Sequence, residues 1–289
     1  PDHYLLRMLY SHGIPLADLG ITPSIGSKVA SPRSAWRTFA RYFYLFRGTP
    51  SALWLNHVFS DVFKMDVCLE ESTADLYFDA IGGALASADF LPRALFKSFN
   101  IELLATTESP LDHLTHHKHI SSSGWDGQIV STYRPDPVLD PNTPAFHDKL
   151  AAFGELTGED TITWKGYLNA HRQRRLDFAA LGTTATDHGH ATALTSNLDP
   201  KESKKLFEKV LSGKFSAEEA ALFQAQMLTE MARMSLDDGL VMQLHPGAYR
   251  NHNQWLFDNY WRDMGADRAQ QTNYTRALKP LLDLVGDGP

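Results

Sequence analysis

The sequence predicts an α/β fold in which parallel strands alternate with helices, preceded by a purely helical segment. After Asn100, short apolar segments alternate with helical patterns. A helix between two strands returns the chain to the same end of the sheet, so neighbouring strands should be parallel. The first hundred residues instead repeat apolar side chains at helical spacing. With 289 residues and 43% hydrophobic content, the chain can bury a full core.

The helical segment covers residues 1–99, and recognisable signals mark its helix boundaries. Ser31-Pro32 precedes an apolar run and favours a helix start, and Gly48 favours a helix end. Five aromatic residues recur at spacings of three and four: Trp36, Phe39, Tyr42, Phe43 and Phe46. Such a stripe is more often core than a cofactor site, and we interpret it as core.

Four short segments after residue 100 have the composition of strands. They are residues 101–107, 128–133, 183–188 and 239–245. Each is followed by polar, turn-forming residues. The carboxyl ends of parallel strands gather at one edge of an open sheet or at one mouth of a barrel. We therefore expect a functional site where these strands end.

Three polar side chains stand out at the strand ends: Arg134, Asp187 and His245. Arg134 offers a planar fork for a carboxylate, although an arginine in a loop more often forms an ion pair, here with Asp136. Asp187 and the adjacent His188, a carboxylate beside an imidazole, could take or give a proton. The alternatives are a turn cap for Asp187 and a supporting, hydrogen-bonded role for His188. His245 follows a nearly continuous apolar strand and should emerge at the mouth.

Composition excludes several classes of function. The net charge of -7 and the lack of a basic run argue against a nucleic-acid partner. No apolar run approaches the roughly 20 residues that span a bilayer, and the first residues lack a signal-peptide pattern. The single cysteine, Cys68, excludes an internal disulfide and favours a reducing cytoplasm. Phosphate-binding glycine loops, GxSxG and HExxH are also missing from the sequence.

Four histidines follow the first predicted strand: His113, His116, His117 and His119. On a helix, the pairs 113 and 117 or 116 and 119 would share a face and imitate metal-ligand spacing. A helix beside a sheet turns its outer face to solvent. We therefore interpret this cluster as solvated histidines.

Five segments, in this order, resemble signature segments of uronate isomerases: DHYLLRML, LATTESPLDHLTHH, TYRPDPV, TDHGH and VMQLHPGAYRNHN. The match runs from the first residues to about Asn253. The resemblance implies the fold of the amidohydrolase superfamily, a distorted (β/α)8 TIM-type barrel of the metal-dependent hydrolase kind with a helical insertion after its first strand. Residues 1–99 would be the insertion, and residues 100–289 would form part of the barrel.

The resemblance also implies an aldose-ketose isomerase of carbohydrate metabolism. Its substrates would be hexuronates, converted from D-glucuronate to D-fructuronate or from D-galacturonate to D-tagaturonate through an enediol at a divalent-metal site, with Zn2+ favoured. The implied roles are catalysis by Tyr4, Asp187 and His188, substrate binding by His3, Arg134 and Arg250, and metal or substrate contact by His245. Arg250 and the nearby Asn253 could instead only order their loop. Without the resemblance, His3 and Tyr4 would be ordinary helix-start residues.

Part of the family's site is not in this sequence. The family has a His-x-His pair on its first strand and an aspartate with a nearby arginine on its last, and neither is present here. We count four strands where a closed barrel needs eight. We therefore expect missing flanking sequence, or strand edges covered by another copy in a homo-oligomer, and a chain that is a poor isomerase alone. The alternatives are a related metal-dependent hydrolase and a non-catalytic binding or assembly protein.

Overall fold

The computed structural model describes residues 2–23, 30–260 and 263–286. The chain divides into two compact units. The first comprises Pro1–Asn100 and Tyr249–Arg268, and the second comprises Ile101–Ala248 and Ala269–Pro289. The segment that follows the last predicted strand thus groups with the first hundred residues, and each unit is described by itself.

The first unit is helical, as predicted. Its elements are α1 (His3–Ser11), η1 (Leu16–Leu19), α2 (Pro32–Arg41), η2 (Phe43–Phe46), α3 (Pro50–His57), the π-helix η3 (Val58–Val62), η4 (Glu71–Thr73), α4 (Ala74–Leu85), η5 (Ala88–Phe90), α5 (Pro92–Ser98) and α12 (Gln254–Tyr260). The predicted start of α2 is confirmed, because the Ser31 hydroxyl accepts a hydrogen bond from the Ser34 amide at 3.2 Å. Gly48 has a positive φ of 75°, which a glycine adopts without strain.

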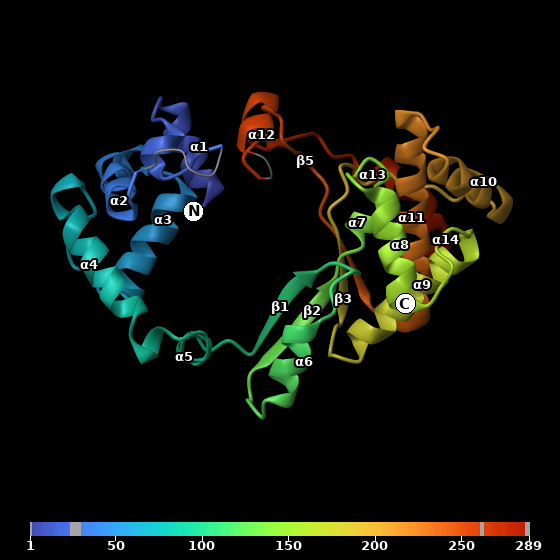
Figure 1. Ribbon diagram of the computed structural model, residues 1–289, viewed down its shortest axis with the longest axis horizontal. Coiled ribbons are helices and arrows are strands. Elements are labelled where there is room, and N and C mark those ends of the chain that lie inside the picture. The colour runs from blue at the N-terminus through green and yellow to red at the C-terminus, as the bar shows by residue number, and fades with distance from the viewer. Residues whose placement is uncertain (1, 24–29, 261–262, 287–289) are drawn as a thin grey trace. The chain divides into compact units, whose positions relative to one another are not determined.

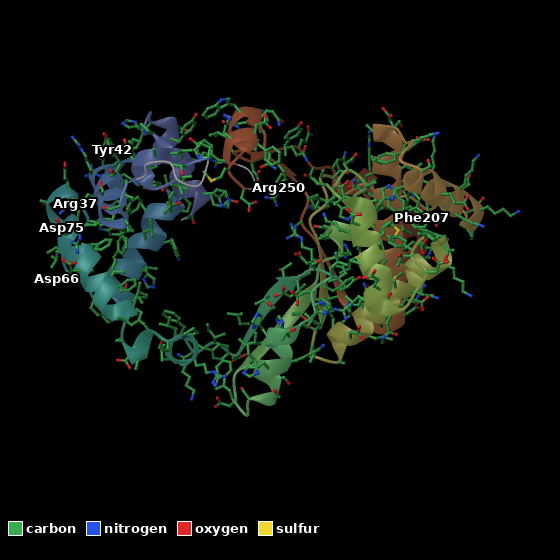
Figure 2. All side chains as sticks on the ribbon, in the orientation of Figure 1. Arg37, Tyr42, Asp66, Asp75, Phe207 and Arg250 are labelled. Atoms are coloured by element: carbon green, nitrogen blue, oxygen red, sulfur yellow. The ribbon has the colours of Figure 1, made fainter. Side chains whose placement is uncertain are left out.

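The aromatic stripe packs into the core of the first unit, which confirms the interpretation from the sequence. Phe43 and Phe46 are buried, and Trp36, Phe39 and Tyr42 pack against the same cluster. Outside this core, Arg37 of α2 pairs with Asp75 of α4, two residues that lie side by side in Figure 2.

The second unit is built on a parallel sheet of four strands, in the order β1-β2-β3-β4, of which Figure 1 labels the first three. The strands are β1 (Leu103–Glu108), β2 (Gln128–Tyr133), β3 (Ala185–His188) and β4 (Val241–Leu244). The predicted strands and their parallel pairing are therefore confirmed. Their carboxyl ends align, since Glu108 lies opposite Tyr133 and His188 opposite Leu244.

The last strand is apolar in sequence but is not buried on both faces. Along β4, exposed and half-buried residues alternate, and Val241 is 64% exposed. The reason is position, because β4 is an edge of this sheet and pairs with β3 alone in the described chain. The sequence analysis also missed a separate two-stranded sheet of β5 (Ala248–Tyr249) and β6 (Arg268–Ala269).

Helices supply the core of the second unit. They are α6 (Thr115–Ser122), α7 (Asp136–Leu139), α8 (Phe146–Thr157), α9 (Trp164–Ala179), α10 (Pro200–Leu211), α11 (Ala217–Asp238), α13 (Tyr274–Ala277) and α14 (Lys279–Val285). Tyr167 of α9 stacks on Phe207 of α10, labelled in Figure 2, with ring centroids 4.8 Å apart. None of the helices in the described ranges has the length and apolar character needed to cross a membrane.

A buried ion pair joins two of these helices. Arg175 of α9 is fully buried, and its guanidinium donates to both carboxylate oxygens of Asp238, at the end of α11, and to the Ser235 hydroxyl. Burying a guanidinium is costly unless a well-placed carboxylate compensates its charge. The pair therefore holds α9 and α11 in register.

Replacing Asp238 with asparagine should destabilise the second unit by about 3 to 5 kcal/mol, because the Arg175 charge stays buried without its partner. Urea denaturation followed by circular dichroism measures this loss. Lys279→Gln removes an exposed pair with Asp283 in the same unit and is the matched control, with a much smaller loss expected. Equal losses in the two variants would contradict the role given to Asp238.

Candidate functional site

The three strand-end residues singled out in the sequence lie together at the carboxyl edge of the sheet. Asp187, in β3, stands between the other two. Its Oδ1 lies 2.7 Å from His245 Nε2, and its Oδ2 lies 3.4 Å from Arg134 Nη1. Asp187 is almost buried, whereas Arg134 and His245 remain partly open to solvent. A carboxylate, an imidazole and a guanidinium thus share one partly exposed edge.

A second carboxylate, Asp136, holds Arg134 from the other side. Arg134 Nε donates to Asp136 Oδ2 at 2.8 Å, so the ion pair considered from the sequence is formed. The Gly189 amide donates to the same carboxylate at 3.1 Å. A Cβ at Gly189 would overlap the Arg134 guanidinium and lie 2.8 Å from Asp136 Oδ2. Only glycine therefore allows this close approach.

His188 has a different environment from its neighbour Asp187, because successive side chains of a strand point to opposite faces. It is completely buried, and its Nε2 lies 3.0 Å from the Thr186 hydroxyl. Burial lowers the pKa of His188 well below its ordinary value, and the nearby His190 and Arg175 add to this effect. The imidazole is therefore neutral, and its catalytic role stays a prediction.

Asp136, His188 and His190 form a group that could hold a metal ion. Each offers one ligand atom, and these atoms lie within 4.8 Å of one another. Burial lowers the pKa of His190 as well, so both imidazoles are in the neutral form that binds metals. The sequence analysis missed Asp136 and His190 as ligands. The His-Gly-His spacing after the third strand was the visible signal, but nothing in the sequence placed Asp136 beside it.

His245, the predicted metal contact, does not belong to this group. Its Nε2 faces Asp187, and among the described residues it does not come together with two further ligands. The residues present therefore do not make a complete metal site around His245.

The interpretation of the histidine cluster is wrong for one of its four members. His113, His116 and His119 are exposed, as expected. His117 is buried, with its Nε2 2.8 Å from the Thr106 hydroxyl of β1. The physical reason is that α6 turns this one position toward the sheet, where a polar strand residue satisfies the ring nitrogen.

The remaining sequence candidates lie in the first unit. The His3 and Tyr4 rings are 4.3 Å apart at the start of α1, where Asp2 caps the helix by accepting from the Tyr4 amide. Arg250 pairs with Asp267. Burial acts to raise the pKa of Asp267, but hydrogen bonds from the Asn251 amide and the Arg250 guanidinium outweigh it and leave the pKa lowered.

Asn253 orders its own loop. Its side-chain oxygen accepts from the Leu256 amide at 3.0 Å, at the start of α12. This bond is a helix-capping interaction. The loop-ordering role that the sequence left open for Asn253 is therefore present in the structure.

Comparison with known proteins shows the family of this chain. The family described as glucuronate isomerase matches residues 1–287. This chain belongs to the glucuronate isomerase family. It is 59% identical over 290 aligned residues to a uronate isomerase of Xanthomonas axonopodis pv. citri (strain 306), which covers all of this chain and 61% of the relative. It is 60% identical over 287 residues to a uronate isomerase of Phenylobacterium zucineum, covering 99% of this chain and 60% of the relative.

Solved structures of the family share the fold. A crystal structure of glucuronate isomerase from Caulobacter crescentus has a TM-score of 0.95 and 53% identity, covering 100% of this chain and 60% of that one. A uronate isomerase from Thermotoga maritima has a TM-score of 0.89 and 26% identity, covering 98% and 61%. The chain thus spans about 60% of the length of the glucuronate isomerase family members that it matches.

A buried histidine supports the strand that leads to Arg134. Tyr133, the last residue of β2, places its hydroxyl 2.7 Å from His171 Nδ1 of α9, and both side chains are fully buried. Burial lowers the pKa of His171 to about 3. In the unfolded chain His171 has an ordinary pKa near 6.5. Between about pH 6.5 and about pH 3, His171 is therefore protonated in the unfolded chain and neutral in the folded chain.

Stability should therefore fall as the pH drops from about 6.5 toward about 3, by about 1.4 kcal/mol per pH unit from His171 alone. In His171→Gln, which does not titrate, the loss between about pH 6.5 and about pH 5 should be about 2 kcal/mol smaller. Urea denaturation at a series of pH values measures the slope. The exposed His113→Gln should keep the parent slope, and an unchanged slope in His171→Gln would refute the assignment.

Proposed function

We propose that this chain carries part of the catalytic site of a hexuronate isomerase, which interconverts aldo- and keto-hexuronates such as D-glucuronate and D-fructuronate, or D-galacturonate and D-tagaturonate. The observation that carries the proposal is the contact of Asp187 with both Arg134 and His245 at the carboxyl edge of a parallel sheet. Family membership supports it.

Arg134 is the proposed partner of the substrate carboxylate. Asp136 holds its Nε, which fixes the plane of the guanidinium. Nη1 also lies 3.4 Å from Asp187, and the two terminal nitrogens together still have donors for a ligand. The side chain is 31% exposed, so a carboxylate can reach it from solvent. A guanidinium presents two parallel donors to a carboxylate, and this geometry orients the rest of the sugar acid.

Asp187 is the proposed proton-transfer residue. The reaction opens the sugar ring, removes the proton from C2 of the aldose, passes through an enediol and places a proton on C1. A nearly buried carboxylate between Arg134 and His245 can take a proton from the ring hydroxyl during opening. His188 lies on the other face of the strand, and its predicted catalytic part rests on the family resemblance. The parts proposed for His3, Tyr4 and Arg250, in substrate binding and proton transfer, rest on the family resemblance.

A divalent metal such as Zn2+ would polarise the substrate oxygens when bound. His245 is the residue of this edge that would touch it, but it needs ligands besides those that this chain places around it. The steps proposed for Arg134 and Asp187 do not depend on the ion.

We also propose that the four strands are part of a (β/α)8 barrel and that the helical segment is its insertion. The exposed edge strands support this, since Leu103 of β1 and Val241 of β4 are 46% and 64% exposed. Open strand edges are usually covered in a stable protein.

The alternative function is that of a metal-dependent hydrolase. Product analysis distinguishes the two, because hydrolysis adds water to the product and isomerisation does not.

In a protein of full family length that contains this chain, Arg134→Lys should raise KM for D-glucuronate about 10- to 100-fold, because lysine keeps the charge but loses the paired donors. Steady-state kinetics of fructuronate formation measure this change. Arg276→Lys, at an exposed position in the same unit, is the control and should behave as the parent. An unchanged KM in Arg134→Lys would exclude Arg134 from carboxylate binding.

Asp187→Asn in the same full-length protein should lower kcat about 10²- to 10⁴-fold, because the amide cannot accept the proton. The amide keeps the shape of the side chain, so KM should change far less than in the Arg134 variant. Single-turnover kinetics of fructuronate formation separate chemistry from release, with the exposed Asp283→Asn as control. Parent-like turnover by Asp187→Asn would rule out the proton-transfer role.

A further inference from the structure

We infer that the second unit holds its own divalent transition-metal site, formed by Asp136, His188 and His190 and distinct from the Asp187 and His245 edge. Asp136 follows β2, His188 is the last residue of β3, and His190 follows β3. The inference concerns metal binding and loop structure, and it stands or falls independently of the isomerase proposal.

The spacing of the ligand atoms suits one ion. The three atoms lie within 4.8 Å of one another, and His190 Nε2 is 3.9 Å from Asp136 Oδ1. Ligands of a tetrahedral zinc ion, each about 2.1 Å from the metal, lie about 3.4 Å apart. The group would therefore have to draw together by at most about 1.4 Å between ligand atoms to reach coordination distance.

Two buried ring nitrogens of this group lack a hydrogen-bond partner among the described residues, and a metal would satisfy both. In the part of the chain that the structure describes, His188 Nδ1 and His190 Nε2 make no hydrogen bond. Leaving such groups buried and unsatisfied is costly, so a native protein usually pairs them. The other nitrogen of His188 lies 3.0 Å from the Thr186 hydroxyl, the kind of outer contact that fixes the orientation of a metal-binding imidazole.

The local charge also favours a cation. Two carboxylates, those of Asp136 and Asp140, interact electrostatically with His190, and the guanidinium of Arg134 opposes them. His245 is a further basic side chain near His190, but it is paired with Asp187. Carboxylates therefore outnumber guanidinium groups around His190, and this arrangement attracts a cation.

The ligand set selects the class of metal. Two imidazoles and one carboxylate suit Zn2+ and similar transition metals, whereas Mg2+ and Ca2+ prefer oxygen ligands alone. The site would tie the segment carrying Asp136 to the segment carrying His188 and His190. Because Asp136 also holds Arg134, the ion would help to position that guanidinium.

The untagged 289-residue chain, stripped of metal by a chelator, tests the inference with Zn2+ and with Co2+ as a spectroscopic probe. We expect one ion per chain by titration calorimetry, and a rise in Tm with Zn2+ that Mg2+ does not produce. In His190→Gln, Co2+ affinity should fall at least about tenfold. The exposed His113→Gln is the matched control and should bind Co2+ as the parent does.

Either the loss of Co2+ binding in His113→Gln or its retention in His190→Gln would overturn the site. If His190→Gln does not fold, X-ray absorption of the Zn2+-loaded parent decides by counting imidazole ligands. Two imidazoles support the inference, and one or none overturns it. A parent chain that binds no Zn2+ also overturns it.

Discussion

Arg134 lies between two carboxylates, and the geometry of the candidate site depends on this arrangement. Asp136 binds its Nε, and Asp187 approaches Nη1 from β3. The same Asp136 carboxylate accepts from the Gly189 amide, so one guanidinium and one carboxylate connect the segments that follow β2 and β3. The connection has no room for a side chain at position 189. A planar group with five donors can satisfy both internal carboxylates and still present donors to a third.

Strand geometry then separates two neighbouring ionisable residues into different chemical environments. Asp187 points to the edge that holds Arg134 and His245, whereas His188 points among the buried side chains with Thr186. Burial lowers the pKa of His188, so its imidazole is neutral, whereas Asp187 contacts two basic side chains at the edge of the sheet. Two residues that are adjacent in the sequence therefore have different surroundings, which the sequence did not reveal.

Periodic features were predictable from the sequence, and features of tertiary packing were not. The four strands, the helices between them and the cap at Ser31 follow local patterns, and the structure has them all. The meeting of Arg134, Asp187 and His245 followed from the parallel order alone. The burial of His117 depends on which face α6 turns to the sheet, and the exposure of β4 depends on its place at an edge. No local pattern encodes either feature.

The shared carboxylate of Asp136 has a consequence when the metal site and the substrate site are considered together. A metal ion bound to Asp136 would compensate part of the carboxylate charge that now attracts the Arg134 guanidinium. The guanidinium then has a weaker internal partner and a stronger attraction for an external carboxylate. Coupling between two binding equilibria is reciprocal, so a bound sugar acid would favour the metal by the same factor. Under both proposals, Asp136 is the residue through which the ion would act on substrate binding without touching the substrate.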